Sequence, residues 1–324
     1  MIDPIPTPPT GSRSAVFFYD AGMNTFQDKT AVLTGAASGF GLELARLAAA
    51  QGMRLMLVDI RDEPLQAVAA ELRAQGAQVA TRCMDVASAA ETEALADETE
   101  RRFGPVHLLF NNAGVAFGGL LWEHTERDWD WVMGANLLSI AHAIRAFVPR
   151  MLAAARADAA YEAHVVNTAS MAGLLVTPNL GAYTVSKHAA VAISEQLYHD
   201  LLLVTRQVHA AVLCPYFVPT GIYDSERYRP AAMQREEATT TSQQLAYAAG
   251  EKAVLGGLVP ATEVAQMVLD GVREQRFWIY THPRAMRPVR QRMESMLAAT
   301  NPRDSMASRP SATAAWREAL GVKL

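Results

Sequence analysis

The chain has 324 residues, half of them hydrophobic, which suits one large globular domain or two small ones. Its formal net charge is −4 and no basic stripe or polybasic run occurs, so we expect neither nucleic acid nor an anionic membrane surface as a partner. With only two cysteines, Cys83 and Cys214, a disulfide framework is excluded and a cytoplasmic location is favoured.

Residues 1–25 precede the first regular pattern and contain four prolines by position 9. The acidic Asp3 and an apolar stretch of only a few residues are unlike a secretory signal, which needs a basic start and a longer apolar core. No run in the chain reaches the roughly 18 apolar residues of a membrane span. We predict a proline-rich arm over residues 1–25, either disordered or packed on a neighbouring subunit.

From Thr30 onward, short apolar runs alternate with longer amphipathic stretches. Seven of these runs are typical of buried strands: 30–35, 54–59, 78–85, 106–114, 164–170, 208–215 and 276–282. Helical patterns lie between them, such as 40–52 and 63–76, which both end on a glycine suited to a helix C-cap. We therefore predict an α/β fold with a Rossmann-like, doubly wound parallel sheet of about seven strands, in a single domain over residues 26–282.

Two segments lie outside this alternation. Residues 221–258 follow the sixth strand and mix tyrosines and aliphatic residues with polar ones. A long segment of this kind inside a compact domain is usually functional, so we predict a mobile lid over the substrate. Residues 283–324 follow the last strand, and there we predict one helix and then a polar tail. Both cysteines fall in strand-like runs, where a buried, unreactive thiol is expected.

The first strand runs directly into a glycine-rich turn, "TGAASGFG", which contains Gly35, Gly39 and Gly41. Glycines between a strand and a helix let the backbone approach a pyrophosphate, and the positive helix N-terminus favours its charge. Asp59 ends the second strand, where a carboxylate accepts hydrogen bonds from an adenosine ribose and repels a 2′-phosphate. We predict NAD as the cofactor, with NADP less favoured, although Arg61 stands close enough to pair with a phosphate.

Tyr183 and Lys187 stand four residues apart at the start of a helical pattern, so their side chains share one helix face. Such a pair arises by chance in many proteins, but here it follows other features in order. These are the glycine turn, "NNAG" at 111–114, Asn136 and Ser170. Their order and spacing resemble the short-chain dehydrogenase/reductase family over roughly residues 27–282.

The resemblance implies a role for each of four residues. Tyr183 is the acid/base, and Lys187 binds the nicotinamide ribose and lowers the pKa of the tyrosine. Ser170 holds the substrate oxygen, and Asn136 supports a proton-relay water. The resemblance also implies the following cofactor contacts: Gly35, Ser38, Gly39, Phe40, Gly41, Asp59, Asp85, Val86, Asn112, Ala113, Gly114, Tyr183, Lys187, Pro215, Val218 and Thr220.

The chemistry explains why a phenol needs the lysine. A phenol titrates near 10 in water, about three units too high for a base at neutral pH, so roughly 4 kcal/mol of phenolate stabilisation is needed. The ammonium of Lys187 and the positive nicotinamide ring can supply it. We therefore expect the pKa of Tyr183 to lie below its usual value, while Ser170 stabilises the developing alkoxide.

Expectations for further residues concern the space around the cofactor, metal binding and packing. Asn111 resembles a residue that borders the cofactor, and Tyr216 stands where the family commonly has glycine, which changes the space beside the nicotinamide. His142 and His188 have no second ligand at metal-like spacing, so we expect no metal site. Three tryptophans are expected to pack a helix against the sheet: Trp122, Trp129 and Trp131.

The sequence thus predicts an NAD-dependent oxidoreductase that interconverts a secondary alcohol and a ketone, with a fairly large apolar or aromatic substrate. Two alternatives remain: a reductase of a different carbonyl or enone substrate, and a catalytically silent, cofactor-binding regulatory protein. The helical stretches 137–155 and 182–204 are more apolar than one sheet face requires. In the family that the chain resembles, helices in these positions commonly pair across two-fold axes, so the resemblance and this composition together imply a homodimer or homotetramer.

Overall fold

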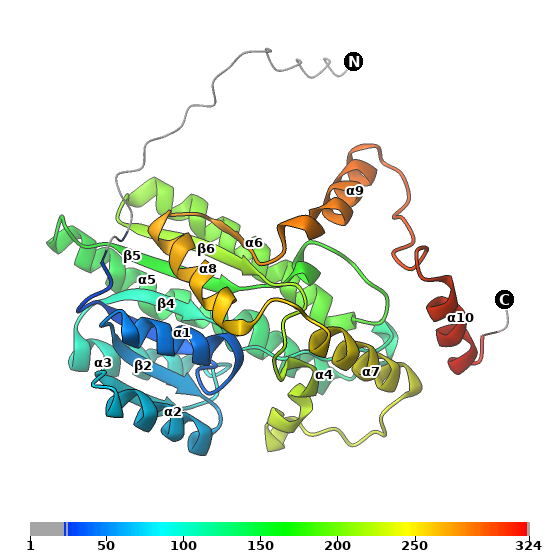
Figure 1. The fold of residues 1–324 in the computed structure, drawn as a ribbon, viewed down its shortest axis with the longest axis horizontal. Helices are drawn as coiled ribbons and strands as arrows, with labels where there is room; N and C mark the ends of the chain where they lie inside the picture. Colours follow the sequence, from blue (N-terminus) through cyan, green and yellow to red (C-terminus); the bar gives the residue numbers. More distant parts are fainter. Residues whose placement is uncertain (1–22, 24, 323–324) are drawn as a thin grey trace, which may run out of the picture.

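Seven parallel strands form one sheet in the computed structural model, which describes residue 23 and residues 25–322 (Figure 1). The strands are β1 Thr30–Thr34, β2 Arg54–Asp59, β3 Val79–Cys83, β4 Val106–Asn111, β5 Ala163–Thr168, β6 Val208–Cys214 and β7 Trp278–Tyr280. They lie in the order β3-β2-β1-β4-β5-β6-β7. The chain winds outward in both directions from the β1/β4 boundary, so a ligand crevice is expected at the carboxyl ends of these two strands.

Helices cover both faces of the sheet. They are α1 Gly39–Ala50, α2 Asp62–Ala74, α3 Ala89–Phe103, α4 Glu126–Met133, α5 Ser139–Ala157, α6 Gly181–Val204, α7 Thr241–Leu255, α8 Ala261–Arg273, α9 Met286–Leu297 and α10 Pro310–Ala319. One hydrophobic core joins α1, α2 and α8 to the sheet, and a second joins α3, α5 and α6 to it. The central strands β1, β4 and β5 are buried along their whole length, because both of their faces meet helices.

A continuous helical stretch, Glu126–Ala157, runs through α4, a π-helical turn at Gly134–Leu138 and α5. By length and composition it is the one helix among the described residues that meets the criteria for crossing a membrane. Here it packs against α3, α6 and β4 within the domain. Burying an apolar helix against a sheet and neighbouring helices also accounts for this composition.

Several boundaries differ from the sequence expectations. The predicted strands 78–85, 106–114 and 276–282 are each shorter in the structure. The residues lost from the carboxyl ends of the first two, 84–85 and 112–114, belong to loops at the edge of the sheet where the site lies. The C-terminal region holds two helices, not one, because "PSATAAWREA" combines helix-forming alanines with a proline in its first turn. Cys83 is exposed, not buried as expected, at the end of the edge strand β3.

The two predicted terminal and lid segments have different outcomes. The arm over 1–25 lies almost entirely outside the described residues, although Met23 is buried in the core. The segment 221–258 is largely regular: it contains 3₁₀ turns at Ile222–Tyr228 and Ala231–Met233, followed by α7. The expectation that it moves as a lid stays a prediction.

Candidate active site

The turn after β1 forms a cradle for an anion at the start of α1. Gly39 has a φ of +55°, and an added Cβ on Gly41 would lie 2.2 Å from the carbonyl oxygen of Gly35. Only glycine therefore allows this close approach of helix and strand. Ser38 occupies the N-cap without a side-chain hydrogen bond to the first turn, which holds no acidic residue. The first N–H groups of α1 keep their hydrogen-bonding capacity for a phosphate.

Asp59 lies at the end of β2, next to this cradle. One carboxylate oxygen accepts a hydrogen bond from the backbone N–H of Ala37 at 3.0 Å, and the other accepts from the Arg61 Nε at 3.1 Å. The Arg61 guanidinium also donates to the Ser38 hydroxyl at 2.9 Å and to the Tyr228 hydroxyl at 3.2 Å. The position expected to read the ribose thus contains a carboxylate and a guanidinium that are paired with each other.

The "NNAG" turn after β4 is fastened to β1. The hydroxyl of Thr34 accepts hydrogen bonds from the backbone N–H groups of Asn112 and Ala113, at 2.9 and 3.0 Å. The Asn112 amide donates to the Thr34 carbonyl at 3.1 Å. An added Cβ on Gly114 would lie 2.9 Å from Asn136 Oδ1 and 3.4 Å from Lys187 Nζ. This contact places the turn against two of the four expected catalytic residues.

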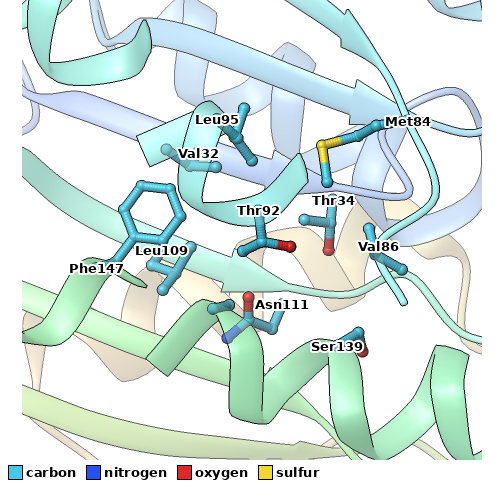
Figure 2. A pocket seen from close by; sticks show the side chains of 11 residues that line it. Val32, Thr34, Met84, Val86, Thr92, Leu95, Leu109, Asn111, Ser139 and Phe147 are labelled. Carbon is cyan, nitrogen blue, oxygen red and sulfur yellow. The ribbon is translucent and has the colours of Figure 1, made fainter. Parts of the chain in front are cut away.

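Asn111 points elsewhere, contrary to the expectation that it borders the cofactor. Its amide donates to the Asn167 Oδ1 at 2.8 Å, on the sheet face covered by α3 and α5. Its side chain lines a cavity of about 10 Å³, beside Thr92 and Ser139 (Figure 2). This volume accommodates about one water molecule. Alternating side chains of a strand face opposite ways, so Asn111 and Asn112 serve different faces of the sheet.

The remaining predicted cofactor residues lie at the same edge of the sheet with different exposures. Asp85 follows β3 and accepts a hydrogen bond from the Ala87 N–H at 2.9 Å, while Val86 lines the cavity in Figure 2. The side chains of Phe40 and Val218 pack into or against the core between α1 and α8, so contacts from these two residues would come mainly from the backbone.

The loop after β6 closes the other side of the cradle. The Pro215 carbonyl accepts a hydrogen bond from the Met171 N–H at 2.9 Å, which joins this loop to the one after β5. The side chain of Thr220 would lie 3.4 Å from a Cβ on Gly39, so the loop reaches the glycine turn. Tyr216 is 38% exposed, and its ring is tilted by 42° against that of Phe217, with centroids 4.3 Å apart. Its ring therefore projects from the loop.

Asn136 lies in the π-helical turn between α4 and α5, and its side chain is almost fully buried. Its Oδ1 accepts from the Val115 N–H at 2.8 Å, and its Nδ2 donates to the Val115 carbonyl and to the Ser186 hydroxyl, both at 2.9 Å. A π-turn widens the helix locally and is frequent at functional sites. Here it turns Asn136 toward the end of β4 and the start of α6.

Tyr183 and Ser170 meet at the carboxyl end of β5. Tyr183 lies in the first turn of α6 and forms a hydrogen bond with the Ser170 side chain. Ser170 also accepts a hydrogen bond from the Ala172 N–H at 3.1 Å, which fixes its hydroxyl. Burial raises the pKa of Tyr183, and the Ser170 hydrogen bond opposes part of this increase. The expected lowering of the Tyr183 pKa is therefore wrong for the protein's own groups. Burial disfavours the charged phenolate more strongly than the Ser170 hydrogen bond favours it.

Lys187 is 2% exposed and stands one helical turn after Tyr183. Its Nζ donates to the Thr168 carbonyl at 2.9 Å and lies 5.8 Å from the centre of the Tyr183 ring. Burial lowers the pKa of Lys187 to about 8. The lysine is therefore held between the catalytic phenol and the end of β5, with its charge weakly solvated.

The arrangement is suited to moving a proton at an oxygen-bearing carbon. A phenol with a bonded serine hydroxyl and a buried amine stands at the carboxyl edge of the sheet, beside a cradle that fits a dinucleotide pyrophosphate. The matched family model, short chain dehydrogenase, covers residues 29–230. The chain belongs to this short-chain dehydrogenase family.

Individual relatives agree with this assignment. A CLA biosynthesis dehydrogenase/reductase of Lactiplantibacillus plantarum is 35% identical over 81% of this chain and 90% of the relative. A 1-deoxy-11-beta-hydroxypentalenate dehydrogenase of Streptomyces avermitilis is 33% identical over 79% of this chain and 85% of the relative. The family is an oxidoreductase family, so the chain is assigned to the oxidoreductases.

Solved structures share the fold. A short chain dehydrogenase/reductase from Burkholderia phymatum in complex with NAD is 46% identical, with a TM-score of 0.84, and the match covers 87% of this chain and 99% of that one. A metagenomic short-chain oxidoreductase in complex with NADP is 24% identical, with a TM-score of 0.60 over 79% of this chain and 96% of that one, and shows the fold alone. The NAD-bound structure, at 46% identity, supports a nicotinamide cofactor for this chain.

Residues that sequence reasoning missed hold the site together. Thr34 holds the turn after β4, and the Thr168 carbonyl holds Lys187. The Ser186 hydroxyl accepts a hydrogen bond from Asn136. Tyr228 joins Arg61 to the segment 221–258, with its ring 4.4 Å from the guanidinium. Thr34 and Ser186 stand beside recognised motifs, which is a usable signal, whereas nothing local marks Tyr228 as a neighbour of Arg61.

Proposed function

We propose that this protein is an NAD-dependent oxidoreductase that interconverts a secondary alcohol and a ketone. The observation that carries the proposal is the cluster at the carboxyl end of β5, where Tyr183 bonds to Ser170 and Lys187 lies one helical turn away. A cofactor-binding regulatory protein has no need for this cluster, and it is complete here. An enone or other carbonyl reductase remains the second enzymatic candidate.

In ketone reduction, Tyr183 donates its proton to the carbonyl oxygen, and in alcohol oxidation it takes the hydroxyl proton. Ser170 hydrogen-bonds the same oxygen and stabilises its developing negative charge. Lys187 provides a positive charge that favours the phenolate, and Asn136 holds the turn after β4 in place. A bound nicotinamide would accept or donate the hydride. A proton-relay water at Asn136 stays a prediction.

The choice of NAD over NADP rests on charge at the ribose end. An open depression beside Asp59 is lined by Arg61, Arg227 and Arg229, among other residues. Each of these guanidiniums is paired with a carboxylate, at 3.1, 3.3 and 2.7 Å respectively. The Asp59 carboxylate repels a 2′-phosphate, and Arg61 is already paired with this carboxylate. The 46% identical structure was solved in complex with NAD, which agrees with this choice.

A fairly large, apolar or aromatic substrate fits the surface around Tyr183. Val176 is 56% exposed on the loop after Ser170, and Tyr216 projects from the loop after β6. Tyr223 and Tyr247 contact one another in the segment 221–258, with ring centroids 5.9 Å apart. The Streptomyces avermitilis relative carries the name of a hydroxy compound as its substrate, which agrees with secondary alcohol chemistry.

The experiment is a panel of 1-phenylethanol-like, cyclic, short-chain, sugar and hydroxy-acid substrates, each with NAD and with NADP, followed at the reduced-nicotinamide absorbance. We expect the highest kcat/KM with NAD and an apolar alcohol. Equal or better use of NADP would overturn the cofactor assignment. A preference for sugars or hydroxy acids would overturn the substrate class, and no turnover despite NADH binding would favour the regulatory alternative.

Asp59→Asn sharpens the cofactor test because it removes the carboxylate and frees Arg61. We expect the kcat/KM ratio of NADP to NAD to rise about tenfold or more, since one charge contact is worth roughly 1.4 kcal/mol or more at a partly buried site. Asp62→Asn, in the exposed first turn of α2, is the matched control and should leave the ratio unchanged.

The proposed assembly is a homodimer or homotetramer in the cytoplasm. Leu203 and Val204 at the end of α6 are 83% and 62% exposed, and Leu138 and Val185 are also exposed. Such apolar exposure on helices is typical of an interface. Sedimentation at micromolar concentration tests this, and a single 35 kDa species would contradict it.

A further inference from the structure

Three potential metal ligands meet at the amino ends of β5 and β6. Glu162 directly precedes β5, and His164 and His209 face each other as register partners on the two strands. Parallel strands in register place such side chains next to one another on the same face. One ligand atom from each residue lies within 4.8 Å of the other two. The sequence did not reveal this cluster because the two histidines come from separate strands.

The distances suit one transition-metal ion. Glu162 Oε1 lies 3.3 Å from His164 Nε2 and 3.9 Å from His209 Nε2. Ligands at roughly 2.0–2.2 Å from a tetrahedral ion stand about 3.3 Å apart, so small side-chain movements complete the geometry. Two imidazoles and one carboxylate form a set used by zinc sites with three protein ligands, which leave the fourth position to water.

The electrostatics also favour a cation. His209 Nε2 is buried and has no hydrogen-bond partner among the described residues. An imidazole nitrogen without a hydrogen-bond partner offers its lone pair to a metal ion. A metal ion would satisfy the nitrogen and balance the carboxylate charge.

Outer contacts and access are both present. Gln275, after α8, donates from its Nε2 to Glu162 Oε1 at 3.2 Å and so orients the carboxylate. Outer-shell hydrogen bonds of this kind hold metal ligands in position. The side chains of Glu162 and His209 are 22% and 16% exposed, whereas His164 is buried. An ion can therefore enter from solvent on the Glu162 side.

We propose that Glu162, His164 and His209 bind one Zn²⁺ or a chemically similar transition-metal ion that joins β5 to β6. The site lies at the opposite end of β5 from Ser170. Six residue steps of extended chain from His164 to Ser170, at about 3.3 Å each, separate the two by roughly 20 Å. An ion at this place stabilises the strand pair and takes no part in the reaction at Tyr183.

The test uses the full chain without a histidine tag, dialysed against a chelator and then titrated with Co²⁺ or Zn²⁺. We expect one equivalent of Co²⁺ with the visible absorption bands of a four-coordinate site, their displacement by Zn²⁺, and a Tm increase of a few degrees at about 100 times the Kd. Alcohol turnover with bound and removed metal should agree within error, since the proposed ion is remote.

Two variants locate the site. His209→Gln and Glu162→Gln should each weaken binding at least tenfold and abolish the cobalt bands, while near-normal NADH binding shows that the protein is folded. His199→Gln, an exposed histidine on α6, is the matched control and should bind as the unmodified chain does. Absence of a saturable equivalent, or unchanged binding by His209→Gln, would overturn the proposal.

Discussion

The catalytic centre and the segment 221–258 are fixed in the structure by different kinds of contact. In the centre, Lys187 is held by the Thr168 carbonyl and Asn136 by both backbone groups of Val115. The segment depends mainly on pairs of side chains from distant parts of the chain. These pairs include Arg229 with Asp128 at 2.7 Å, Tyr228 with Arg61 at 3.2 Å, and Ser242 with Glu123 at 2.6 Å.

This difference separates what is common to a family from what is particular to one chain. Backbone groups are present whatever residue supplies them, so a centre held in this way needs only its own few side chains in the right order. A segment held by side-chain pairs needs both members of each pair. We infer that the centre sets the type of reaction and that the segment sets the substrate, and the predictions below test this division.

The largest effect is expected from Tyr183→Phe, which removes the proton donor and keeps the ring. Turnover should fall by about 10²–10⁴-fold, the usual worth of general acid–base catalysis, while NADH binding measured by fluorescence stays close to normal. Tyr198→Phe on the same helix is the matched control, since that ring packs near Phe277, away from Ser170. A Tyr183→Phe enzyme with more than about a tenth of the normal rate would mean that another group moves the proton.

Breaking the main tie of the segment should give the next largest effect. Asp128 and Arg229 form a fully buried pair, and the guanidinium also lies 4.2 Å from the centre of the Trp131 ring. Asp128→Asn removes the buried partner of the Arg229 guanidinium and leaves it only the half-exposed Glu226 carboxylate, 3.6 Å away. Losing the buried partner of a buried charge costs about 3–5 kcal/mol in the free energy of unfolding, measured by urea denaturation.

The exposed pair Arg127–Glu236, 2.8 Å apart, offers the control for that measurement. Glu236→Gln should change the free energy of unfolding by no more than about 1 kcal/mol. If the segment 221–258 sets the substrate, as we infer, Asp128→Asn also raises KM for substrates more than it lowers kcat. A variant with normal stability, or with a pure kcat defect, would mean that the segment and the centre are not separate in this way.

The same division explains how much the sequence predicted. The parallel sheet, its strand number and the family followed from apolar runs and from motifs that act locally, such as the turn containing Gly39 and Gly41. The pairing of Tyr228 with Arg61 and of Arg229 with Asp128 joins residues far apart in the chain, and no local pattern indicates it. The three tryptophans show the limit: Trp131 packs in the core as expected, but Trp122 is 79% exposed.

Burial explains the other difference. The sequence places an ammonium beside a phenol and so suggests a lowered pKa for Tyr183, but it does not report how deeply each group is buried. Desolvation acts on both groups, raising the pKa of the phenol and lowering that of Lys187. Desolvation depends on the surrounding elements, including β5, β6 and α6, and therefore cannot be read from the spacing of two residues.

A third prediction concerns the stability of the folded protein, which the burial of Lys187 in the catalytic centre lowers and which contacts such as those of the segment 221–258 maintain. Burial lowers the pKa of Lys187 from 10.5 to about 8, so between these pH values the unfolded chain binds a proton that the folded chain has released. Stability therefore rises with pH across this window, by up to about 3 kcal/mol at roughly 1.4 kcal/mol per pKa unit. Lys187→Met lacks this dependence, although it is expected to be inactive.

The measurement compares urea denaturation of Lys187→Met and the unmodified chain at pH 7.5 and 10. The variant should be the more stable of the two at pH 7.5, apart from the lost hydrogen bond to Thr168, and this advantage should shrink at pH 10. Lys252→Met, an exposed lysine on α7, should show no such change. A difference independent of pH would indicate that Lys187 stays charged in the folded protein.

The smallest effect concerns the contact between the segment 221–258 and Arg61, which lies next to Asp59, where the cofactor ribose is expected. Two guanidiniums contact the Tyr228 ring, with Arg61 4.4 Å and Arg227 4.5 Å from its centre, and its hydroxyl accepts a hydrogen bond from Arg61. Tyr228→Phe removes only the hydrogen bond, worth about 0.5–1.5 kcal/mol, so KM for NAD should rise by roughly two- to tenfold with kcat unchanged. Tyr228→Leu also removes the ring, which adds about 0.5–1 kcal/mol at a partly exposed site.

The matched control for Tyr228 is Tyr223→Phe, in the same 3₁₀ turn but in contact with Tyr247 instead of Arg61. If the segment affects cofactor binding through Tyr228, only the Tyr228 variants change KM for NAD, and Tyr228→Leu changes it more than Tyr228→Phe does. Tyr223→Phe should instead alter KM for the alcohol, because its ring lies on the proposed substrate side. Equal effects of Tyr228→Phe and Tyr223→Phe on both KM values would contradict separate roles for these two side chains, because any change in the segment would then affect both sites alike.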